Sequence, residues 1–279
     1  MKNFIFSLTL IFTFNAFPMF RALNTAATGM SAQEQNVSSI SNNIANLNTI
    51  GFKKGRTEFE DLLYETITEA GSKSSATTEY NVGLQIGTGA KVTAVRKEFS
   101  LGDPQLTNNP FDFMIRGQGF FGVIMPSGEV QYTRDGSFNV EKTGTLVDKN
   151  GYKVFPGLVF PPNTKSVHVS NDGKVDAYIE GQVEPVNIGQ MPVFTFINPV
   201  GLKSMGGNLF RTTTSSGTAI QNIAGQENSG PIEQGTLESS NVKIMNEMTS
   251  LIKAQRAYEM NSKVMGIADQ MLQTINNIR

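Results

Sequence analysis

The sequence predicts an α+β protein in which helices at the two chain ends pair with each other and a mostly antiparallel β domain is inserted between them. Near both termini, apolar residues recur every seven positions, which is typical of a helix that buries one seam against another helix. Between the termini, short runs of β-branched and aromatic residues alternate with turns that contain glycine. Pairing of the terminal helices requires that the two ends of the inserted β domain lie close together.

The N-terminal helix is predicted to begin near Leu23 and to end at Gly51, since glycine commonly terminates helices. Apolar residues occupy positions spaced by seven, together with positions three or four residues away from them. The opposite face carries Ser, Thr, Asn and Gln with few charges. The predicted assembly seam of this helix consists of Leu23, Met30, Val37, Ile40, Ile44 and Leu47.

The C-terminal helix is predicted over about 242–276, with Ser240 or Asn241 as its N-cap. Gly266 lies inside this helix and costs roughly 1 kcal/mol relative to alanine. The predicted assembly seam consists of Ile244, Met248, Leu251, Tyr258, Met265, Leu272 and Ile275. Two matching seams, one on each terminal helix, predict that these helices pack together.

The chain divides by composition into further segments. The predicted inner, helical domain comprises 19–63 and 241–279, and the β-rich outer domain comprises 90–211. Residues 64–89 form a polar insertion rich in Gly, Ser and Thr, which is predicted to be extended or loosely ordered. Residues 212–240 are predicted to be a polar connection that leads back to the C-terminal helix.

Residues 1–18 differ in composition from the rest of the chain. One lysine followed by an apolar run from Phe4 to Phe14 is typical of a secretory signal, and the run is too short for a transmembrane helix. The residues that follow, "FNAFP", lack the small-x-small pattern of a signal cleavage site. The alternative interpretation is that translation begins at Met19, and the fold prediction excludes the segment in either case.

The composition argues against several classes of function. Lys and Arg number 23 and Asp and Glu 24, so the net charge of −1 provides no general attraction to nucleic acid or to an anionic membrane. The chain has no cysteine, which excludes disulfides, thiolate catalysis and cysteine-ligated metals. His168 is the single histidine and lies in an alternating strand pattern, whereas a histidine-rich metal site needs several. No cofactor, metal or small-molecule substrate is expected.

Three short patterns match catalytic motifs only superficially. "GQGFFG" at 117–122 has the spacing of a dinucleotide-binding loop, but the residues after it predict a strand instead of the required helix. Ser240 and Lys243 have the S-x-x-K spacing of a serine nucleophile and its base, but the companion motifs are missing. Glu58 and Asp61 would share one face of an expected helix, in a cluster with Glu60. Because Lys53, Lys54 and Arg56 are adjacent, a solvated or interface-facing ion-pair network is a better interpretation than acid–base catalysis. The sequence therefore predicts no enzyme.

Both ends of the chain resemble the flagellar rod and hook family. The stretch "SNNIANLNTIGFKKGR" is similar to the family's N-terminal signature, and "EMTSLIKAQRAYEMNSKVMGIADQMLQTI" is similar to its C-terminal helix. The segments "FEDLLYETI", "GLQIGTG", "IRGQGFFGV" and "YTRDGSF" resemble those of the distal-rod members in the same order. The resemblance covers nearly all of 19–279. The matching signature residues are Asn42, Asn43, Asn46, Gly51, Phe52, Gln255, Arg256 and Tyr258.

The resemblance implies a structural subunit of the flagellar basal body, closest to the distal rod. Such subunits are exported from the cytoplasm without a cleaved leader, which favours Met19 as the start. They self-assemble into a helical tube that spans the periplasm, encloses the export channel and transmits torque from the motor to the hook. The implied partners are further copies of the chain, proximal rod subunits, hook or hook-side subunits, the P- and L-ring proteins and the export apparatus.

The resemblance also implies roles for particular segments. The insertion that matches 64–89 would lock neighbouring subunits of the distal rod and stiffen the tube. Small polar residues on the terminal helices would permit close approach between copies. Two alternatives stay open: a proximal-rod or hook subunit with the same terminal helices, and a secreted β-rich binding protein that uses the leader as a true signal. The second alternative would not need two matched heptad helices.

Overall fold

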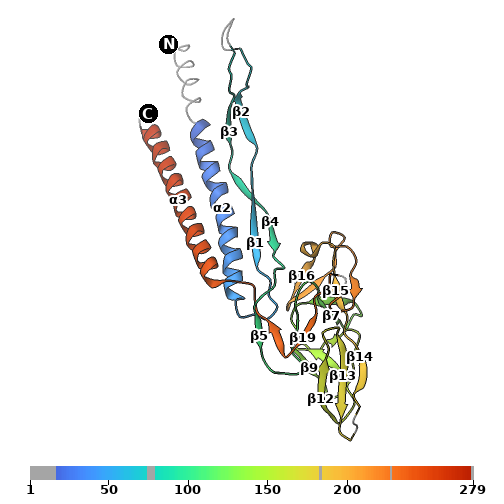
Figure 1. The fold of residues 1–279 in the computed structure, drawn as a ribbon. Helices are drawn as coiled ribbons and strands as arrows, with labels where there is room; N and C mark the ends of the chain where they lie inside the picture. Colours follow the sequence, from blue (N-terminus) through green and yellow to red (C-terminus); the bar gives the residue numbers. More distant parts are fainter. Residues whose placement is uncertain (1–16, 74–78, 182–183, 227, 278–279) are drawn as a thin grey trace, which may run out of the picture. The chain divides into compact units, whose positions relative to one another are not determined.

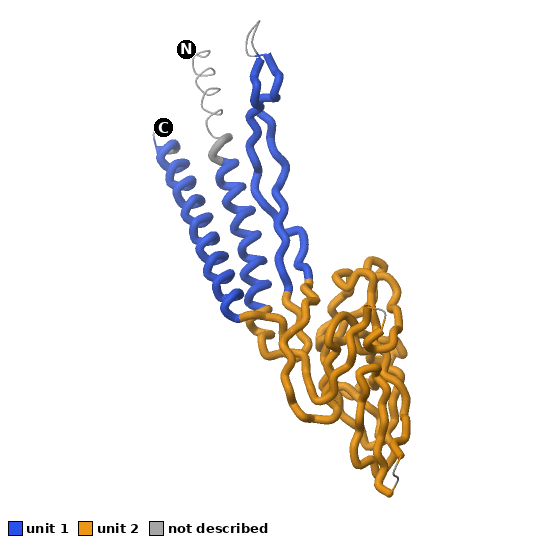
Figure 2. The backbone as a smooth tube through the Cα atoms, viewed as in Figure 1, with its two compact units in different colours: residues 1–42, 55–96, 244–279 blue, residues 43–54, 97–243 orange. Residues whose placement is uncertain are grey.

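The computed structural model describes residues 17–73, 79–181, 184–226 and 228–277. The chain forms two compact units (Figure 2): unit 1 comprises 1–42, 55–96 and 244–279, and unit 2 comprises 43–54 and 97–243. Apart from Phe17 and Pro18, the segment interpreted as a leader or as upstream of a later start lies outside the described residues. Within the described ranges, no helix is both long enough and apolar enough to cross a membrane.

The two predicted terminal helices run side by side in opposite directions (Figure 1). Helix α2 extends over Phe17–Ala45 and helix α3 over Ile244–Asn277. In unit 1 the helices approach each other through small residues. A Cβ atom added to Gly29 would lie 2.7 Å from Nδ2 of Asn261, and Ala26 and Ala254 are almost completely buried. The predicted pairing is confirmed, and small side chains permit a short distance between the helix axes.

The end of α2 and the start of α3 both differ from the prediction. Helix α2 ends at Ala45 instead of Gly51, because Asn46 and Thr49 favour turns: the hydroxyl of Thr49 donates to Oδ1 of Asn46 at 3.1 Å. Helix α3 begins at Ile244, so the predicted N-cap is wrong. The Ser240 hydroxyl accepts from the backbone N–H of Val242 at 3.3 Å. The Asn241 side chain binds other segments of the chain.

Unit 1 also contains two strand pairs. Strands β1 (Gly55–Asp61) and β4 (Ala90–Lys97) form one two-stranded sheet, and β2 (Tyr64–Thr68) pairs antiparallel with β3 (Leu84–Gly87). The second pair occupies much of the predicted insertion. The helix expected around Glu58 and Asp61 is wrong, since both residues belong to β1.

The acidic residues of β1 form ion pairs with cations of β4. Glu58 lies 2.9 Å from Nε of Arg96, and Glu60 lies 3.3 Å from Nζ of Lys91. Opposite charges on neighbouring strands favour pairing of those strands. An ion-pair network at these carboxylates is therefore confirmed, but among the described residues only Arg56 of the predicted cations belongs to it, and it joins two strands instead of covering a helix.

Unit 2 consists of short strands that pair antiparallel wherever their register is defined, as predicted. Its largest sheet has seven strands in the order β16-β17-β8-β7-β11-β10-β9, and a three-stranded sheet has the order β12-β13-β14. The pairs β15–β18, β19–β6 and β20–β5 complete the unit. The strand bounds are β5 Pro104–Leu106, β6 Phe113–Ile115, β7 Phe121–Ile124, β8 Val130–Thr133, β9 Phe138–Val140, β10 Leu146–Asp148, β11 Lys153–Val154, β12 Thr164–Val169, β13 Lys174–Ile179, β14 Val186–Gln190, β15 Val193–Thr195, β16 Lys203–Gly206, β17 Leu209–Arg211, β18 Ile220–Asn222, β19 Ile232–Gln234 and β20 Thr236–Glu238.

The core of unit 2 forms two clusters, a larger one that combines aliphatic residues with phenylalanines and a smaller one that is mainly aromatic. The larger cluster includes Phe121 and Phe138, whose rings meet edge to face with centroids 5.4 Å apart. The smaller cluster includes Phe120 and Phe210 at 5.9 Å in the same geometry, which is a favoured arrangement of aromatic rings. The segment 212–240, predicted to be a polar connection, contains β18, β19 and β20, whose isolated apolar residues give no alternating pattern in the sequence.

Candidate functional site

The segment that follows α2 is built into unit 2 by buried polar contacts. We define the junction as residues 50–54, 97–102, 134–135 and 238–241, all of which belong to unit 2. It brings together the end of the N-terminal segment, the start and the end of the β domain, and the tight turn after β8. The junction therefore lies where the chain enters and leaves the β domain.

Four charged side chains are buried in the junction: Asp135 pairs with Lys149 at 2.5 Å, and the other three form one cluster. Lys53 and Glu238 are each 1% exposed, and Arg134 is 3% exposed. Nζ of Lys53 donates to Oε1 of Glu238 at 2.5 Å, and Nη1 of Arg134 donates to Oε2 of the same carboxylate at 3.4 Å. The carboxylate of Glu238 thus pairs with both cations, and the cluster of Lys53, Arg134 and Glu238 carries a formal charge of +1.

Backbone groups satisfy most of the remaining hydrogen-bonding capacity of this cluster. Lys53 also donates to the carbonyl of Ser100 at 2.7 Å, and Nη2 of Arg134 donates to the carbonyl of Gly117 at 2.6 Å. Oε1 of Glu238 accepts from the backbone N–H of Gly102 at 2.9 Å. Buried ion pairs are tolerated when such additional hydrogen bonds complete their environment.

Glu238 is the group that favours the charged forms of both cations. Burial lowers the pKa of Lys53 below its ordinary value, and the attraction of Glu238 opposes that shift. Burial likewise lowers the pKa of Arg134, again against the attraction of Glu238. Loss of the carboxylate would therefore leave two desolvated cations close together.

Gly51 fits its place in the junction only as glycine. Its φ is +68°, and a Cβ atom there would lie 2.6 Å from the backbone nitrogen of Asp135. Its own N–H donates to the carbonyl of Glu238 at 2.8 Å. The next residue, Phe52, is buried, with Nζ of Lys97 positioned 4.5 Å from its ring centroid. These residues of the family signature thus anchor the chain inside unit 2.

Replacement of Gly51 by alanine is expected to lower the free energy of unfolding by about 3 kcal/mol, because backbone strain and a backbone clash add together. The matched control is Gly128→Ala, at a φ of +83° with no atom within 4 Å of the added Cβ. This control is expected to cost only about 1 kcal/mol of strain. Urea titration of the two purified variants measures the difference. Equal losses in both would show that the contact with the Arg134–Asp135 backbone is unimportant.

The Asn241 side chain is the polar link nearest to α3. Oδ1 accepts from the backbone N–H of Lys54 at 2.8 Å, and Nδ2 donates to the carbonyl of Glu98 at 2.8 Å and to the Ser100 hydroxyl at 3.0 Å. The carboxamide therefore connects three segments of unit 2 that are far apart in sequence. Sequence reasoning assigned this residue to a helix cap because Asn before an apolar run is a common cap signal.

The predicted seam residues of α2 and the turn after it face inward to different degrees. Ile40 is buried, and the others are partly buried; Leu47 lies beyond the end of α2. The partly buried members are Leu23, Met30, Val37, Ile44 and Leu47.

The predicted seam residues of α3 divide into two groups. Leu251, Met265 and Leu272 are partly buried. The remaining members are exposed, at between 40% and 48%: Ile244, Met248, Tyr258 and Ile275. Of the signature residues outside the junction, Asn43 is buried, Asn46 is partly buried, and Asn42, Gln255 and Arg256 are exposed.

Helix α3 carries a second apolar surface that the sequence reasoning missed. Met260, Val264, Ile267 and Met271 are spaced by four, three and four residues, and we call them the outer stripe. Each of them is between 44% and 60% exposed. Side chains at this spacing lie on one face of a helix. The four-three-four spacing is visible in the sequence, but the seven-residue seam of the same helix offers a second apolar pattern that masks it.

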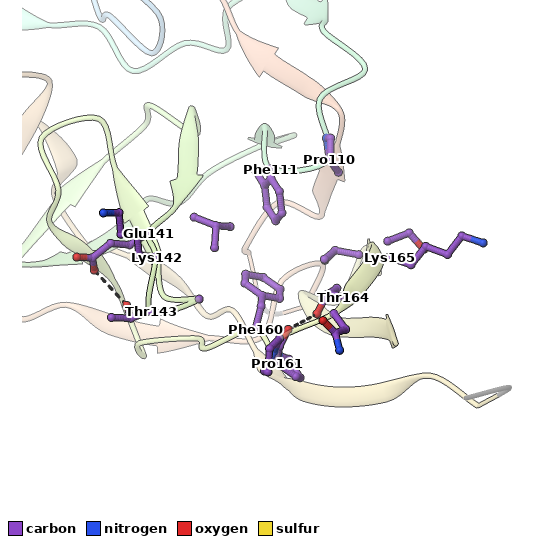
Figure 3. A pocket seen from close by; sticks show the side chains of 15 residues that line it. Pro110, Phe111, Glu141, Lys142, Thr143, Phe160, Pro161, Thr164 and Lys165 are labelled. Atoms are coloured by element: carbon purple, nitrogen blue, oxygen red, sulfur yellow. Dashed lines mark hydrogen bonds between the residues drawn. The ribbon is translucent and has the colours of Figure 1, made fainter. Parts of the chain in front are cut away.

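A groove in unit 2 is lined by residues 110–111, 140–144 and 160–167 and has a volume of about 570 Å³ (Figure 3). Its apolar wall includes Phe111 and Phe160, whose rings meet edge to face at 5.6 Å. The hydroxyl of Thr143 donates to Glu141 at 3.2 Å, and that of Thr164 donates to the carbonyl of Pro161 at 2.7 Å. These hydroxyls thus stabilise their own turns. Across the described ranges there is no cluster of three or more His, Cys, Asp or Glu residues that could hold a metal ion.

Comparison with known proteins gives matches along most of the chain. Three family models match: flagella basal body rod protein at 23–53, flagellar hook protein FlgE/F/G D1 domain at 114–177, and flagellar basal body rod FlgEFG protein C-terminal at 233–278. The flagellar basal-body rod protein FlgG of Borreliella burgdorferi is 46% identical over 263 residues, which are 94% of this chain and 99% of that protein.

Two further relatives come from other bacteria. The flagellar basal-body rod protein FlgG of Caulobacter vibrioides is 46% identical, over 93% of this chain and 99% of the relative. In Bacillus subtilis, the flagellar hook-basal body complex protein FlhP is 31% identical, over 94% of this chain and 100% of the relative.

Proposed function

Because this chain belongs to the flagellar basal-body rod protein family, we propose that it assembles with further copies of itself into the distal rod. The rod is a helical tube that encloses the export channel and transmits torque from the motor to the hook. The observation that carries the assembly step is the outer stripe of α3, whose large apolar side chains stay between 44% and 60% exposed in the described part of the chain. Contiguous apolar surface of this kind on a protein marks an interaction site.

The outer stripe supports contact between copies through α3 more than through α2. Among the described side chains of α2, Phe20 is the only large apolar one that is exposed. On α3, the outer stripe is joined by further exposed apolar residues: Met245, Met248 and Ile252. Burial of a fully exposed side chain of this size contributes about 1.5–3 kcal/mol. We therefore assign the contact between copies to the outer stripe and the exposed seam residues of α3.

The strand pair β2–β3 offers a second surface for neighbouring copies. Leu63 is 88% exposed and Val82 is 80% exposed, and other exposed apolar residues accompany them: Tyr64, Ile67 and Leu84. A two-stranded hairpin is marginally stable by itself in water. Contact with another copy would bury these side chains and stabilise the strands, which agrees with a locking role for 64–89.

A contact in which α3 of one copy meets β2–β3 of the next joins two different surfaces and is therefore head-to-tail. Repeated head-to-tail contacts that do not close into a ring generate an open helical polymer. The proposed partners beyond copies of the chain are proximal rod subunits, hook-side subunits, ring proteins and the export apparatus. The proposed role is purely structural, with no reaction assigned to the chain.

The distal rod is preferred to another position in the same structure because of the identities. The relatives named rod protein FlgG reach 46%, whereas the hook-basal body complex protein FlhP reaches 31%. The insertion at 64–89 favours the same choice.

Mass spectrometry of purified basal bodies from the source bacterium tests the proposal. We expect the chain to be recovered in the rod fraction and to be absent from that fraction when its gene is deleted. Recovery only as a free periplasmic protein would contradict the rod assignment. The same spectra identify the N-terminal peptide and so distinguish a cleaved leader from a start at Met19.

A further inference from the structure

The chain passes between its two units four times, after residues 42, 54, 96 and 243. Three of these passages are adjacent to the junction in sequence. A single passing segment can rotate about its φ and ψ angles and therefore transmits little torsion. Segments that are hydrogen-bonded to one another cannot rotate independently. Hydrogen bonds among these segments on the unit 2 side of the passages therefore limit the independent rotation of each segment.

Two of the three segments are bonded directly to each other. The backbone N–H of Glu98 donates to the carbonyl of Lys54 at 2.9 Å. The side chains of the same two residues form an ion pair, with Nζ of Lys54 3.1 Å from Oε2 of Glu98. Nζ of Lys97 donates to the carbonyl of Lys53 at 3.0 Å. Residues 53–54 and 97–98 thus form one hydrogen-bonded ribbon.

Asn241 joins the third segment to this ribbon immediately before α3. The acceptor atom of its carboxamide meets the N–H of Lys54, and its donor atom meets the carbonyl of Glu98. Asparagine supplies an acceptor and a donor in one rigid plane; aspartate lacks the donor, and an apolar residue lacks both. Glu238 joins the same segments three residues earlier, so Asn241 is the last of these links before the chain enters α3.

We infer that Asn241 is a positioning residue, a clasp that holds residues 53–54, 97–100 and 241 in fixed register where these segments continue into unit 1. Torque applied to either unit is then carried by three segments acting together instead of by the two-segment ribbon with a more loosely held third segment. This inference rests on the proposed function of the chain as a torque-transmitting rod subunit. The clasp itself is a property of the isolated chain and can be measured without the rod.

Hydrogen exchange on the purified full chain measures the clasp directly. In Asn241→Ala, the backbone amide of Lys54 loses its acceptor and is expected to exchange about tenfold faster than in the wild type. The matched control is Asn187→Ala, which removes an exposed side-chain hydrogen bond of 2.9 Å to Asp176 in the same unit. The control is expected to leave the Lys54 amide unchanged. An unchanged Lys54 amide in Asn241→Ala would overturn the inference.

Rod release from cells under mechanical load tests the proposed role of the clasp. The wild type and both variants are produced in a strain that lacks its own copy, and rods released into the medium are counted at low and high viscosity. We expect the same low release for all three at low viscosity, and increased release for Asn241→Ala alone at high viscosity. A general loss of stability would change assembly at both viscosities. Equal release by all three at high viscosity would contradict the load-bearing role.

Two further outcomes are distinguishable. If the wild type fails to restore rods, the proposed function is wrong, and the exchange experiment alone decides whether the clasp exists. If Asn241→Ala does not fold, Asn241→Asp replaces it, because aspartate keeps the size and the acceptor for Lys54 but loses both donor contacts. For that variant we expect a protected Lys54 amide together with increased release at high viscosity. Rods that withstand the load would overturn the inference.

Discussion

Replacement of Glu238 by glutamine is expected to lower the free energy of unfolding by about 3–5 kcal/mol, because it leaves two buried cations without their shared carboxylate. Glutamine keeps the size of the side chain and one acceptor oxygen, so loss of charge is the main change. Lys53 and Arg134 would then repel each other at positions where burial already disfavours their charged forms. Calorimetry or urea titration of the purified chain measures the loss.

Replacement of Lys53 by methionine is expected to be much milder, at about 1–2 kcal/mol. Methionine fills a similar volume, and Glu238 keeps Arg134 and the N–H of Gly102 as partners. The surface control is Glu129→Gln, whose partner Arg211 lies 3.9 Å away at an exposed site; its loss should stay below about 0.5 kcal/mol. If Lys53→Met proved as costly as Glu238→Gln, charge balance would not explain the cluster.

Replacement of Ile267 by aspartate is expected to abolish rod formation while leaving the isolated chain as stable as the wild type. Ile267 is 52% exposed at the centre of the outer stripe, so the folded chain loses little packing. In the polymer, a buried and unpaired carboxylate would cost several kcal/mol at every contact between copies. Electron microscopy of basal bodies and swimming assays measure the effect in cells, and thermal unfolding measures the monomer.

The control for this change is Gln270→Asp, an exposed polar position on the same helix, three residues away. It introduces the same charge and costs at least as much helix propensity but lies outside the outer stripe. We expect normal rods in this variant. Normal rods in Ile267→Asp would remove the outer stripe from the assembly surface, and failure of both variants would show that α3 tolerates no added charge.

Local periodicity explains which parts of the fold could be predicted from the sequence. The seven-residue spacing from Leu23 to Ile44 predicted α2, and the alternating runs around Phe121 and Val167 predicted strands. These signals depend only on neighbouring residues. The end of α2 was misplaced because the side chain of Asn46 competes with the helical backbone, which a spacing rule does not capture.

The junction could not be predicted because its members are distant in the chain. Lys53 and Glu238 are separated by 185 residues, and no periodicity links them. Gly51 has the sequence signal of a helix end. Only glycine fits there, however, because a Cβ atom would clash with the backbone of Arg134 and Asp135, which are distant in sequence. The helix cap predicted at Ser240 or Asn241 was wrong for the same reason. The local rule considers neighbouring residues only, whereas the Asn241 side chain binds Lys54, Glu98 and Ser100.

The separation of Lys53 from Glu238 also determines when unit 2 can close. During synthesis the lysine emerges early, and its carboxylate partner is added only when nearly the whole chain exists. Pairing of such distant residues carries a large loop-closure cost and comes late in folding. A chain that ends before Glu238 lacks the carboxylate that Lys53 and Arg134 share. Unit 2 of such a truncated chain is therefore expected to be less stable than unit 2 of the full chain.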